Sequence, residues 1–353
     1  MSYRDPFPNP GSYTAGSGEP RLRWGILAPG GIAAAFATAL RAHTTQSISA
    51  VASRSAERAE KFAARFEVPR FFASYNALVE DPSIDVVYVA APASEHRALG
   101  LLAMAAGKHV VIEKPLAISV ADAVELVAAS REHGVFLMEA MWTRYLPQTA
   151  VINELVTSGR IGEPRGIIAD HWQAIPDDPS HRLYRPELGG GALLDLGIYP
   201  IQLDSMVLGA PDAVFATGVL ATTGVDAFST LVLDHGGSRM SSITSSLLAR
   251  SSGAASIIGT EGRIDIDGPA HIPTSFTLRG IDLNSPQERW TDPSGLTRYA
   301  GLSWEITAAA TFIGDGLRQS PVHTLEECIQ ILTTIEMART QLGTVGVVAE
   351  VAR

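Results

Sequence analysis

Three side chains have the types and settings expected of a site for hydroxyl chemistry. Lys114 ends an apolar run in VVIEKP, where Pro115 restricts the backbone beside it. Asp195 and Tyr199 occur four residues apart in GGGALLDLGIYP, so a helix would project both from one face. An ammonium group stabilises developing negative charge, and a phenol exchanges a proton with a hydroxyl. Together these residues predict an acid–base site; each alone also fits a structural role.

A glycine-containing turn near the start of the chain fits the binding of a dinucleotide. The stretch RLRWGILAPGGIAAAF reads as a strand that runs into a helix through Ala28, Pro29, Gly30 and Gly31. Such a turn presents the first amides of the helix, around Ile32, to a pyrophosphate. Ala28 stands where the first glycine of the fingerprint is expected, and Pro29 favours an extended Ala28 that tolerates its side chain. A purely structural turn is the alternative.

The end of the second predicted strand indicates which dinucleotide is bound. NAD-binding proteins commonly place an acidic residue there for the ribose hydroxyls. This sequence has Ser53 and Arg54 instead, a hydroxyl and a guanidinium that suit a 2′-phosphate. We therefore expect NADP, with NAD as the less favoured cofactor. The alternative for Arg54 is a solvated charge at the end of a strand.

Apolar runs that alternate with helical patterns form the first part of the chain. Strands are predicted at 22–27, 48–53, 86–91, 109–113 and 135–139, with helices at 32–42, 56–66, 95–106 and 121–133. Continuous apolar strands joined by helices are typical of a doubly wound parallel sheet, the Rossmann fold. Lys114 then lies at the carboxyl end of a strand, where ligands of such sheets bind.

After residue 142 the pattern becomes that of an α+β domain. Helices are predicted at 147–157, 189–208, 304–317 and 325–342, and strands at 213–220, 228–233, 240–248, 255–259, 263–266 and 275–278. Strands without intervening helices favour a mostly antiparallel open sheet. We divide the chain into a flexible or surface-draped arm (1–20), a dinucleotide-binding Rossmann domain (21–142) and a substrate-binding and dimerisation domain (143–353).

The composition of the chain excludes several classes of binding partner. The net charge of −10 argues against nucleic acid and against an anionic membrane surface, and no apolar run is long enough for a membrane span. A single cysteine, Cys328, excludes an intrachain disulfide and fits the cytoplasm, and its helical setting predicts an inert buried residue. The histidines lack ligand spacing, so no metal site is predicted. An uncovered sheet face favours a homodimer.

Seven motifs follow one another between about residues 24 and 263: GILAPGGIA, AVASRS, APASEH, EKP, LMEAMWTRYLP, GGGALLDLGIYP and IIGTEGRI. As a set they resemble the glucose–fructose oxidoreductase/inositol dehydrogenase family, the Gfo/Idh/MocA oxidoreductases. The segments MEAMWTR and DLGIY are most similar to the branch of dimeric dihydrodiol dehydrogenase and NADP-dependent D-xylose dehydrogenase. The family forms dimers through its second domain, which agrees with the expectation above.

The resemblance implies roles for individual residues. Lys114, Tyr199 and Asp195 would be catalytic, with Asp195 and Tyr199 beside the nicotinamide. Trp142 and Arg144 would lie near the nicotinamide end of the cofactor, and His96 near its ribose. The implied cofactor site consists of Gly30, Gly31, Ile32, Ser53, Arg54, Ala91, Pro92, His96, Glu113, Lys114, Trp142 and Arg144. The departure of Ala28 from the family pattern bears on cofactor affinity more than on the reaction.

The expected function is NADP-dependent transfer of a hydride between nicotinamide and a hydroxyl-bearing carbon of a sugar, polyol or related diol. Tyr199 would act as the base, aided by the ammonium of Lys114, or with the two roles exchanged. The segment 171–188 supplies Trp172, His181 and Arg185 for a substrate wall, but it reads equally as a surface loop, and its arginines also suit an acidic substrate. Alternatives are an NAD-dependent inositol-type dehydrogenase and a nucleotide-binding regulatory protein without turnover.

Overall fold

A computed structural model describes residues 6–282 and 284–344, which divide into two compact units. Residues 12–145 and 298–329 form one, here called the Rossmann unit, and residues 6–11, 146–297 and 330–344 form the other, the sheet unit. The break after Tyr145 lies close to the predicted boundary at 142. Residues 298–329, expected in the second domain, instead pack with the Rossmann unit.

The Rossmann unit contains a parallel sheet of six strands in the order β3-β2-β1-β4-β5-β6. The strands are β1 (Arg23–Leu27), β2 (Ser47–Ala52), β3 (Phe71–Phe72), β4 (Val86–Val89), β5 (His109–Glu113) and β6 (Leu137–Ala140). All four residues of β4 are buried, as expected of a strand covered on both faces. The strand order reverses between β1 and β4, and ligands of such sheets bind at this point. The predicted doubly wound sheet is confirmed.

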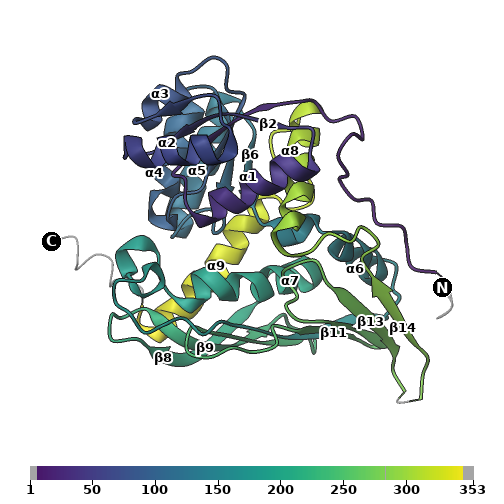
Figure 1. Cartoon of the computed structure of the whole chain (residues 1–353). Helices are drawn as coiled ribbons and strands as arrows, with labels where there is room; N and C mark the ends of the chain where they lie inside the picture. Colours follow the sequence, from purple (N-terminus) through teal and green to yellow (C-terminus); the bar gives the residue numbers. More distant parts are fainter. Residues whose placement is uncertain (1–5, 283, 345–353) are drawn as a thin grey trace. The chain divides into compact units, whose positions relative to one another are not determined.

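Helices surround this sheet, as Figure 1 shows in purple and blue. They are α1 (Gly31–His43), α2 (Ala56–Phe66), α3 (Tyr75–Val79), α4 (His96–Ala105), α5 (Val120–His133) and, from the later part of the chain, α8 (Leu302–Gly314), which contacts α1. Local chemistry sets their ends. The hydroxyls of Ser55 and Ser119 accept the amides of Arg58 and Asp122 as N-caps, and Gly134 ends α5 with φ of 62°.

The turn between β1 and α1 corrects one prediction. Ala28 was expected to be extended because a proline follows it, but its φ is +61°, in the left-handed region. Its amide still donates to the carbonyl of Ala52 in β2, so Ala28 is held at the end of the sheet. The chain must therefore turn sharply after it to begin α1 at Gly31. The need to pass from strand to helix outweighs the local preference, and an alanine adopts a conformation that favours glycine.

The sheet unit contains eight strands in the order β14-β13-β12-β11-β7-β10-β9-β8. They are β7 (Pro164–Trp172), β8 (Ala213–Leu220), β9 (Asp226–Asp234), β10 (Met240–Ser246), β11 (Ala255–Gly259), β12 (Gly262–Ile266), β13 (Ser275–Gly280) and β14 (Gln287–Thr291). Neighbours are antiparallel except β7 and β10. The mostly antiparallel sheet is confirmed, although β7, a central strand, was not predicted.

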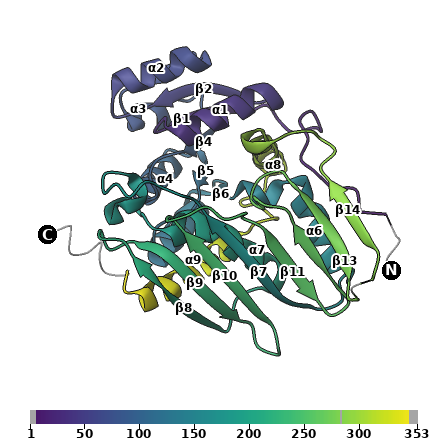
Figure 2. The ribbon, with the colours of Figure 1, turned by 60° about the horizontal axis from the view of Figure 1, so that its bottom comes forward.

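Three helices cover one face of this sheet: α6 (Pro147–Thr157), α7 (Ile198–Leu208) and the later part of α9 (Leu325–Leu342). In the core between them, Val151 and Leu155 of α6 pack with Ile167, Ile257 and Leu278 of the sheet. The other face, turned toward the reader in Figure 2, carries no helix among the described residues. Its exposed apolar side chains are Ile168, Phe215, Val219 and Met240.

The described part of the N-terminal arm has no helix or strand, but two rings anchor it. Phe7 packs edge-on against Phe276 in the sheet unit, with ring centroids 5.5 Å apart. Tyr13 packs against Phe312 in the Rossmann unit at 5.1 Å. The arm therefore lies on the surface rather than extending into solvent. Over residues 6–282 and 284–344, no helix combines the length and apolar character needed to cross a membrane.

Candidate active site

The turn after β1 has the geometry required of a phosphate site. Helix α1 begins at Gly31, and no side chain caps its first amides, which leaves them for a ligand. Its first turn contains no acidic residue that would repel an anion. A Cβ built on Gly31 meets nothing within 4 Å, and one on Gly30 meets only the Ala28 carbonyl oxygen, at 3.9 Å. Gly30 and Gly31 are exposed and Ile32 half-buried, so the backbone faces open space.

The end of β2 presents positive charge. Ser53 is buried, and its hydroxyl accepts the amide of Ser55 at 3.2 Å. The Arg54 side chain is 74% exposed, with Glu95 as a distant ion-pair partner at 3.9 Å. Arg54 and Arg58 both act on the phenol of Tyr75, whose pKa is raised by burial against their opposing effect. Sequence reasoning missed Arg58, which lies one helical turn after Arg54.

Lys114 follows β5 at its carboxyl end, and the peptide bond between it and Pro115 is cis. Its amide donates to the carboxylate of Glu113 at 3.2 Å, while the buried Tyr88 donates its hydroxyl to the same carboxylate. Glu113 is therefore held from two sides, and it fixes the backbone from which the lysine side chain projects. The half-buried Lys114 side chain lies beside an anchored loop rather than at a free strand end.

His96, expected near the cofactor ribose, is 1% exposed and holds two loops together. Its Nδ1 lies 2.8 Å from the carbonyl oxygen of Pro115, and its Nε2 lies 2.9 Å from that of Ala91. Burial lowers the pKa of the imidazole. His96 thus connects the end of β4, where Ala91 and Pro92 lie, to the turn that carries Lys114. Its position is that of a residue supporting these two loops, and its place beside a cofactor stays a prediction.

Trp142 and Arg144 lie in one turn after β6. The buried indole of Trp142 stacks on Tyr299, with ring centroids 5.9 Å apart and planes inclined by 24°. Arg144, also expected near the nicotinamide, has a side chain only 2% exposed, and its guanidinium pairs with Glu327. Arg144 therefore joins the turn to α9, and Trp142 packs against Tyr299, so both side chains are buried within the Rossmann unit.

Asp195 and Tyr199 come from an irregular helix start. Leu193–Gly197 forms one π-helical turn that continues directly into α7, so Pro200 lies inside a continuous helical segment, just after the turn where regular α-helical hydrogen bonding is interrupted. The Asp195 carboxylate accepts from the Arg182 guanidinium at 3.1 and 3.3 Å. Wide π turns recur at functional sites, and here Asp195 lies within the turn while Tyr199 follows it in α7.

Two histidines surround Tyr199, and sequence reasoning missed both. His171 in β7 and His271 after β12 stack with ring centroids 4.2 Å apart, and Tyr199 lies 5.3 Å from the first ring and 4.7 Å from the second. His171 is buried, whereas Tyr199 and His271 are half-buried. The sequence could have indicated His171 only through its place on the inward side of β7, and this strand was not predicted.

The predicted substrate residues are not gathered in one place. Trp172 follows His171 in β7 and so projects to the other side of the sheet, where its indole donates to Thr244 at 2.9 Å and packs edge-on against Phe228. The ring of His181 accepts the Leu183 amide as a cap, and the exposed Arg185 donates to Glu187 at 2.6 Å. Arg182, from the same segment, contacts Asp195.

These features define a class of protein. A Rossmann unit with an open phosphate turn, followed by a mixed sheet covered by helices on one face, is the architecture of a two-domain nicotinamide-dependent oxidoreductase. Residues 22–141 match the model of the oxidoreductase family with an NAD-binding Rossmann fold, and residues 149–265 match the GFO/IDH/MocA C-terminal domain. The chain belongs to the Gfo/Idh/MocA family and is an NAD(P)-dependent oxidoreductase.

Curated relatives extend over nearly the whole chain. A trans-1,2-dihydrobenzene-1,2-diol dehydrogenase from Xenopus laevis is 36% identical over 325 residues, covering 91% of this chain and 98% of the relative. The human protein of that name is 33% identical over 326 residues, covering 91% of this chain and 97% of its own. The predicted relation to the dihydrodiol dehydrogenase branch is therefore confirmed.

Solved structures agree. A 3-ketoreductase from Actinomadura kijaniata, in complex with NADP and TDP-benzene, is 27% identical with a TM-score of 0.79, covering 92% of this chain and 98% of its own. Levoglucosan dehydrogenase in complex with NADH and levoglucosan has a TM-score of 0.82 at 21% identity, covering the same shares, and supports the fold. One of these structures holds NADP and the other NADH.

Proposed function

We propose that this protein is an NADP-dependent dehydrogenase of a diol or of a sugar-like polyol. The observation that carries the proposal is the setting of Tyr199, a half-buried phenol at the start of α7, directly after a π turn and beside two imidazole rings. The names of the relatives supply the substrate class, because they act on a dihydrodiol and one structural neighbour binds a sugar derivative. Rings of this kind suit the apolar face of such a substrate, and their nitrogens suit its hydroxyls.

The cofactor preference rests on the end of β2. Two exposed arginines, Arg54 and Arg58, act on the same phenol of Tyr75, and the described residues place no acidic side chain in the strand end at 52–54. A 2′-phosphate would be paired by the guanidinium groups, whereas the ribose diol of NAD would lack its usual carboxylate. Gly30, Gly31 and Ile32 would hold the pyrophosphate through their amides.

In this proposal the bound nicotinamide supplies the acceptor for a hydride, and the side chains of the chain move the proton. Tyr199 takes the proton of the substrate hydroxyl, and the ammonium of Lys114 stabilises the resulting negative charge. A free phenol titrates at about 10, so it needs such a cation to act as a base at neutral pH. Asp195 orients Arg182 or a second hydroxyl of the substrate.

The test compares turnover in Lys114→Met and Tyr199→Phe with matched changes elsewhere. Lys61→Met, on exposed helix α2, and Tyr13→Phe, in the arm, make the same chemical changes outside the proposed site. Reduction of NADP⁺ is followed by absorbance with a panel of trans-dihydrodiols and aldoses. Loss of general acid–base catalysis lowers kcat by about 10²- to 10⁴-fold. Near-normal kcat in both site variants refutes the assignment, and binding of NADPH without turnover of any substrate favours a regulatory protein.

We also propose a homodimer through the uncovered face of the eight-stranded sheet. Ile168, Phe215, Val219 and Met240 lie on this face, and each is more than half exposed. An apolar face of this kind is a liability in water and is usually buried against another copy. A small-molecule substrate and a cytoplasmic location complete the proposal, the latter because the one cysteine is a buried free thiol.

A further inference from the structure

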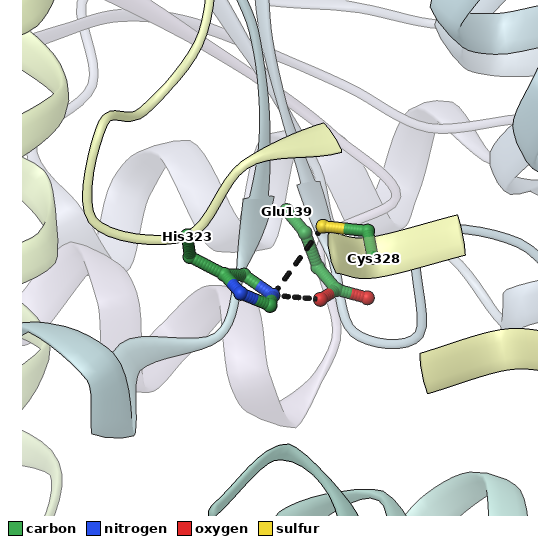
Figure 3. A group of neighbouring side chains, drawn as sticks. All are labelled: Glu139, His323 and Cys328. Atoms are coloured by element: carbon green, nitrogen blue, oxygen red, sulfur yellow. Dashed lines mark hydrogen bonds and ion pairs between the residues drawn. The ribbon is translucent and has the colours of Figure 1, made fainter. Parts of the chain in front are cut away.

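Three potential ligand side chains meet inside the Rossmann unit (Figure 3). Glu139 comes from β6, His323 from the segment before α9, and Cys328 from the first turns of α9. Each is about 1% exposed. The Nε2 atom of His323 lies 2.7 Å from Oε2 of Glu139 and 3.3 Å from Sγ of Cys328, and all three donor atoms lie within 4.8 Å of one another. The cluster joins positions 184 residues apart, so sequence spacing gave no signal.

The donor set has the composition of a transition-metal site. An imidazole nitrogen, a carboxylate oxygen and a thiolate sulfur are ligands of zinc, at about 2.0–2.1, 2.0–2.2 and 2.3 Å. Donors at those distances lie roughly 3.3–3.6 Å apart around a tetrahedral ion, so the nitrogen and oxygen atoms, now 2.7 Å apart, would need to separate by roughly 0.7 Å and the nitrogen and sulfur atoms, now 3.3 Å apart, by roughly 0.3 Å. A carboxylate and a thiolate also neutralise one divalent cation, and a neutral centre is what a buried site requires.

The surroundings already hold these side chains in place. The second carboxylate oxygen of Glu139 accepts the Leu116 amide at 2.6 Å. Ser320 accepts the amide of His323 at 3.1 Å, which fixes the backbone before α9. Thr324 caps α9 by accepting the amide of Glu327 at 3.2 Å. Supporting hydrogen bonds of this kind orient the ligands of metal sites, and here they already hold the candidate ligands in place.

His323 has a partner for each of two tautomers. Without a cation, its Nε2–H donates to Glu139, and its Nδ1 accepts from Nε of Arg144 at 3.4 Å. With Nε2 on a metal, its Nδ1–H donates to Glu327, whose Oε2 lies 3.3 Å away. A carboxylate behind a histidine ligand is the usual arrangement in zinc sites. The pair of Arg144 and Glu327 thus supports either state.

A second, independent observation is a buried carboxyl group near the cluster that lacks a hydrogen-bond partner in the described part of the chain. Glu305 in α8 is 1% exposed, and neither of its carboxylate oxygens has a hydrogen-bond partner among residues 6–282 and 284–344. It interacts electrostatically with both Glu113 and Glu139. A buried carboxyl group without a hydrogen-bond partner is costly, and a cation bound at the neighbouring Glu139 would offset that cost.

We propose that Glu139, His323 and Cys328 bind one divalent metal ion of the zinc class and so fasten the start of α9 to the end of β6. The described chain provides three ligands, and water completes the tetrahedron. The site is separate from the dinucleotide turn and does not depend on the function proposed above.

The experiment uses the full-length chain without a histidine tag, stripped with EDTA under reducing conditions and titrated with Co²⁺ at neutral pH. We expect one cobalt per chain by metal analysis, a sulfur-to-cobalt charge-transfer band and tetrahedral visible bands, all displaced by Zn²⁺. Nitrogen-15 spectra of the histidine rings should show His323 changing tautomer as the metal binds. Because these readouts use the wild-type protein, they do not depend on the folding of any variant.

Variants identify the ligands. Cys328→Ser should abolish the charge-transfer band, and His323→Gln should lower the metal affinity at least tenfold. Glu326→Gln, which changes an exposed neighbour on the same helix, should bind as the wild type does. The proposal is overturned if the reduced wild-type protein, with a titratable thiol after unfolding, binds less than stoichiometric cobalt. Cobalt binding with unchanged affinity in Cys328→Ser, or a wild-type cobalt complex without the sulfur-to-cobalt band, also overturns it.

Discussion

His171 and Trp172 are consecutive residues of β7, but their side chains lie on opposite faces of the eight-stranded sheet. His171 is buried on the helix-covered face, where its ring lies 5.3 Å from that of Tyr199 in α7. Trp172 lies on the uncovered face with Thr244 and Phe228. One strand therefore separates two surfaces with different chemistry, one suited to a substrate and one to a partner copy. The predicted substrate role of Trp172 becomes a proposed interface role.

The uncovered face yields the first prediction. Ile168 lies on the same face as Trp172, four residues earlier, and is 61% exposed. Ile168→Glu places a charge in the middle of the proposed interface, which disfavours burial of that face. We expect sedimentation analysis to show a monomer for this variant and a dimer for the wild type. Val124→Glu makes the same kind of change at an exposed site on α5 and should leave the dimer intact. Wild-type monomers at micromolar concentration contradict the interface.

Arg54 yields the second prediction. Arg54→Ala removes charge-assisted hydrogen bonds to the 2′-phosphate, which contribute about 1.5–3 kcal/mol. The Kd for NADPH should therefore rise roughly 10- to 150-fold, while the Kd for NADH changes little. Arg65→Ala removes another exposed arginine, from the last turn of α2, and serves as the control. Tryptophan fluorescence quenching measures both constants, and an equal loss for the two cofactors contradicts a phosphate contact.

The sequence was informative wherever local pattern decides structure. Helices α2, α6 and α9 and strands β5, β8 and β11 have the predicted bounds, because strong hydrophobic periodicity or continuous apolar runs coincide with capping residues and glycines. Strand β7 was missed because PRGIIADHW starts with a proline and a glycine and contains charges. What makes it a strand is its place between β10 and β11, a tertiary relation that no short window contains.

The candidate site residues also divide into those that local sequence indicates and those that depend on tertiary structure. Lys114, Tyr199 and the phosphate turn are recognisable from adjacent letters. His171 and His271 contact Tyr199 only because a strand and a loop, 100 residues apart, are brought together by the sheet. Ala28 was misjudged because the rule for residues before proline describes an isolated dipeptide, whereas the turn must join a strand to a helix.

Ala28 yields the third prediction. A non-glycine residue in the left-handed region costs about 1–2 kcal/mol. Glycine avoids this cost, but its greater conformational freedom in the unfolded chain lowers the stability by roughly 0.5–1 kcal/mol. Ala28→Gly should therefore raise the free energy of unfolding by up to about 1 kcal/mol and bind NADPH at least as tightly as the wild type does. Ala35→Gly, within helix α1, should lower it by about 0.5–1 kcal/mol. Urea denaturation compares the variants, and destabilisation by Ala28→Gly contradicts the strained turn.

Asp226 yields the last prediction, a dependence of stability on pH. Its carboxylate is 1% exposed and accepts the amide of Leu193 at 2.7 Å, at the start of the π turn that carries Asp195. Gly191 makes room for it, because a Cβ there would lie 2.3 Å from the Asp226 Oδ1 atom. Burial raises the pKa of Asp226 from 3.8 to about 6. The folded protein therefore holds this proton more tightly than the unfolded chain does.

A raised pKa contributes stability that is fully present below the unfolded value and is lost as the pH rises through the folded value. Between about pH 4 and pH 7, the free energy of unfolding of the wild type should fall relative to that of Asp226→Asn by up to about 3 kcal/mol, at 1.36 kcal/mol per pKa unit. The amide cannot ionise but keeps an oxygen for the Leu193 amide. Urea denaturation of both proteins across this range measures the difference, and a difference that stays constant with pH shows that the carboxyl group ionises normally in the folded state.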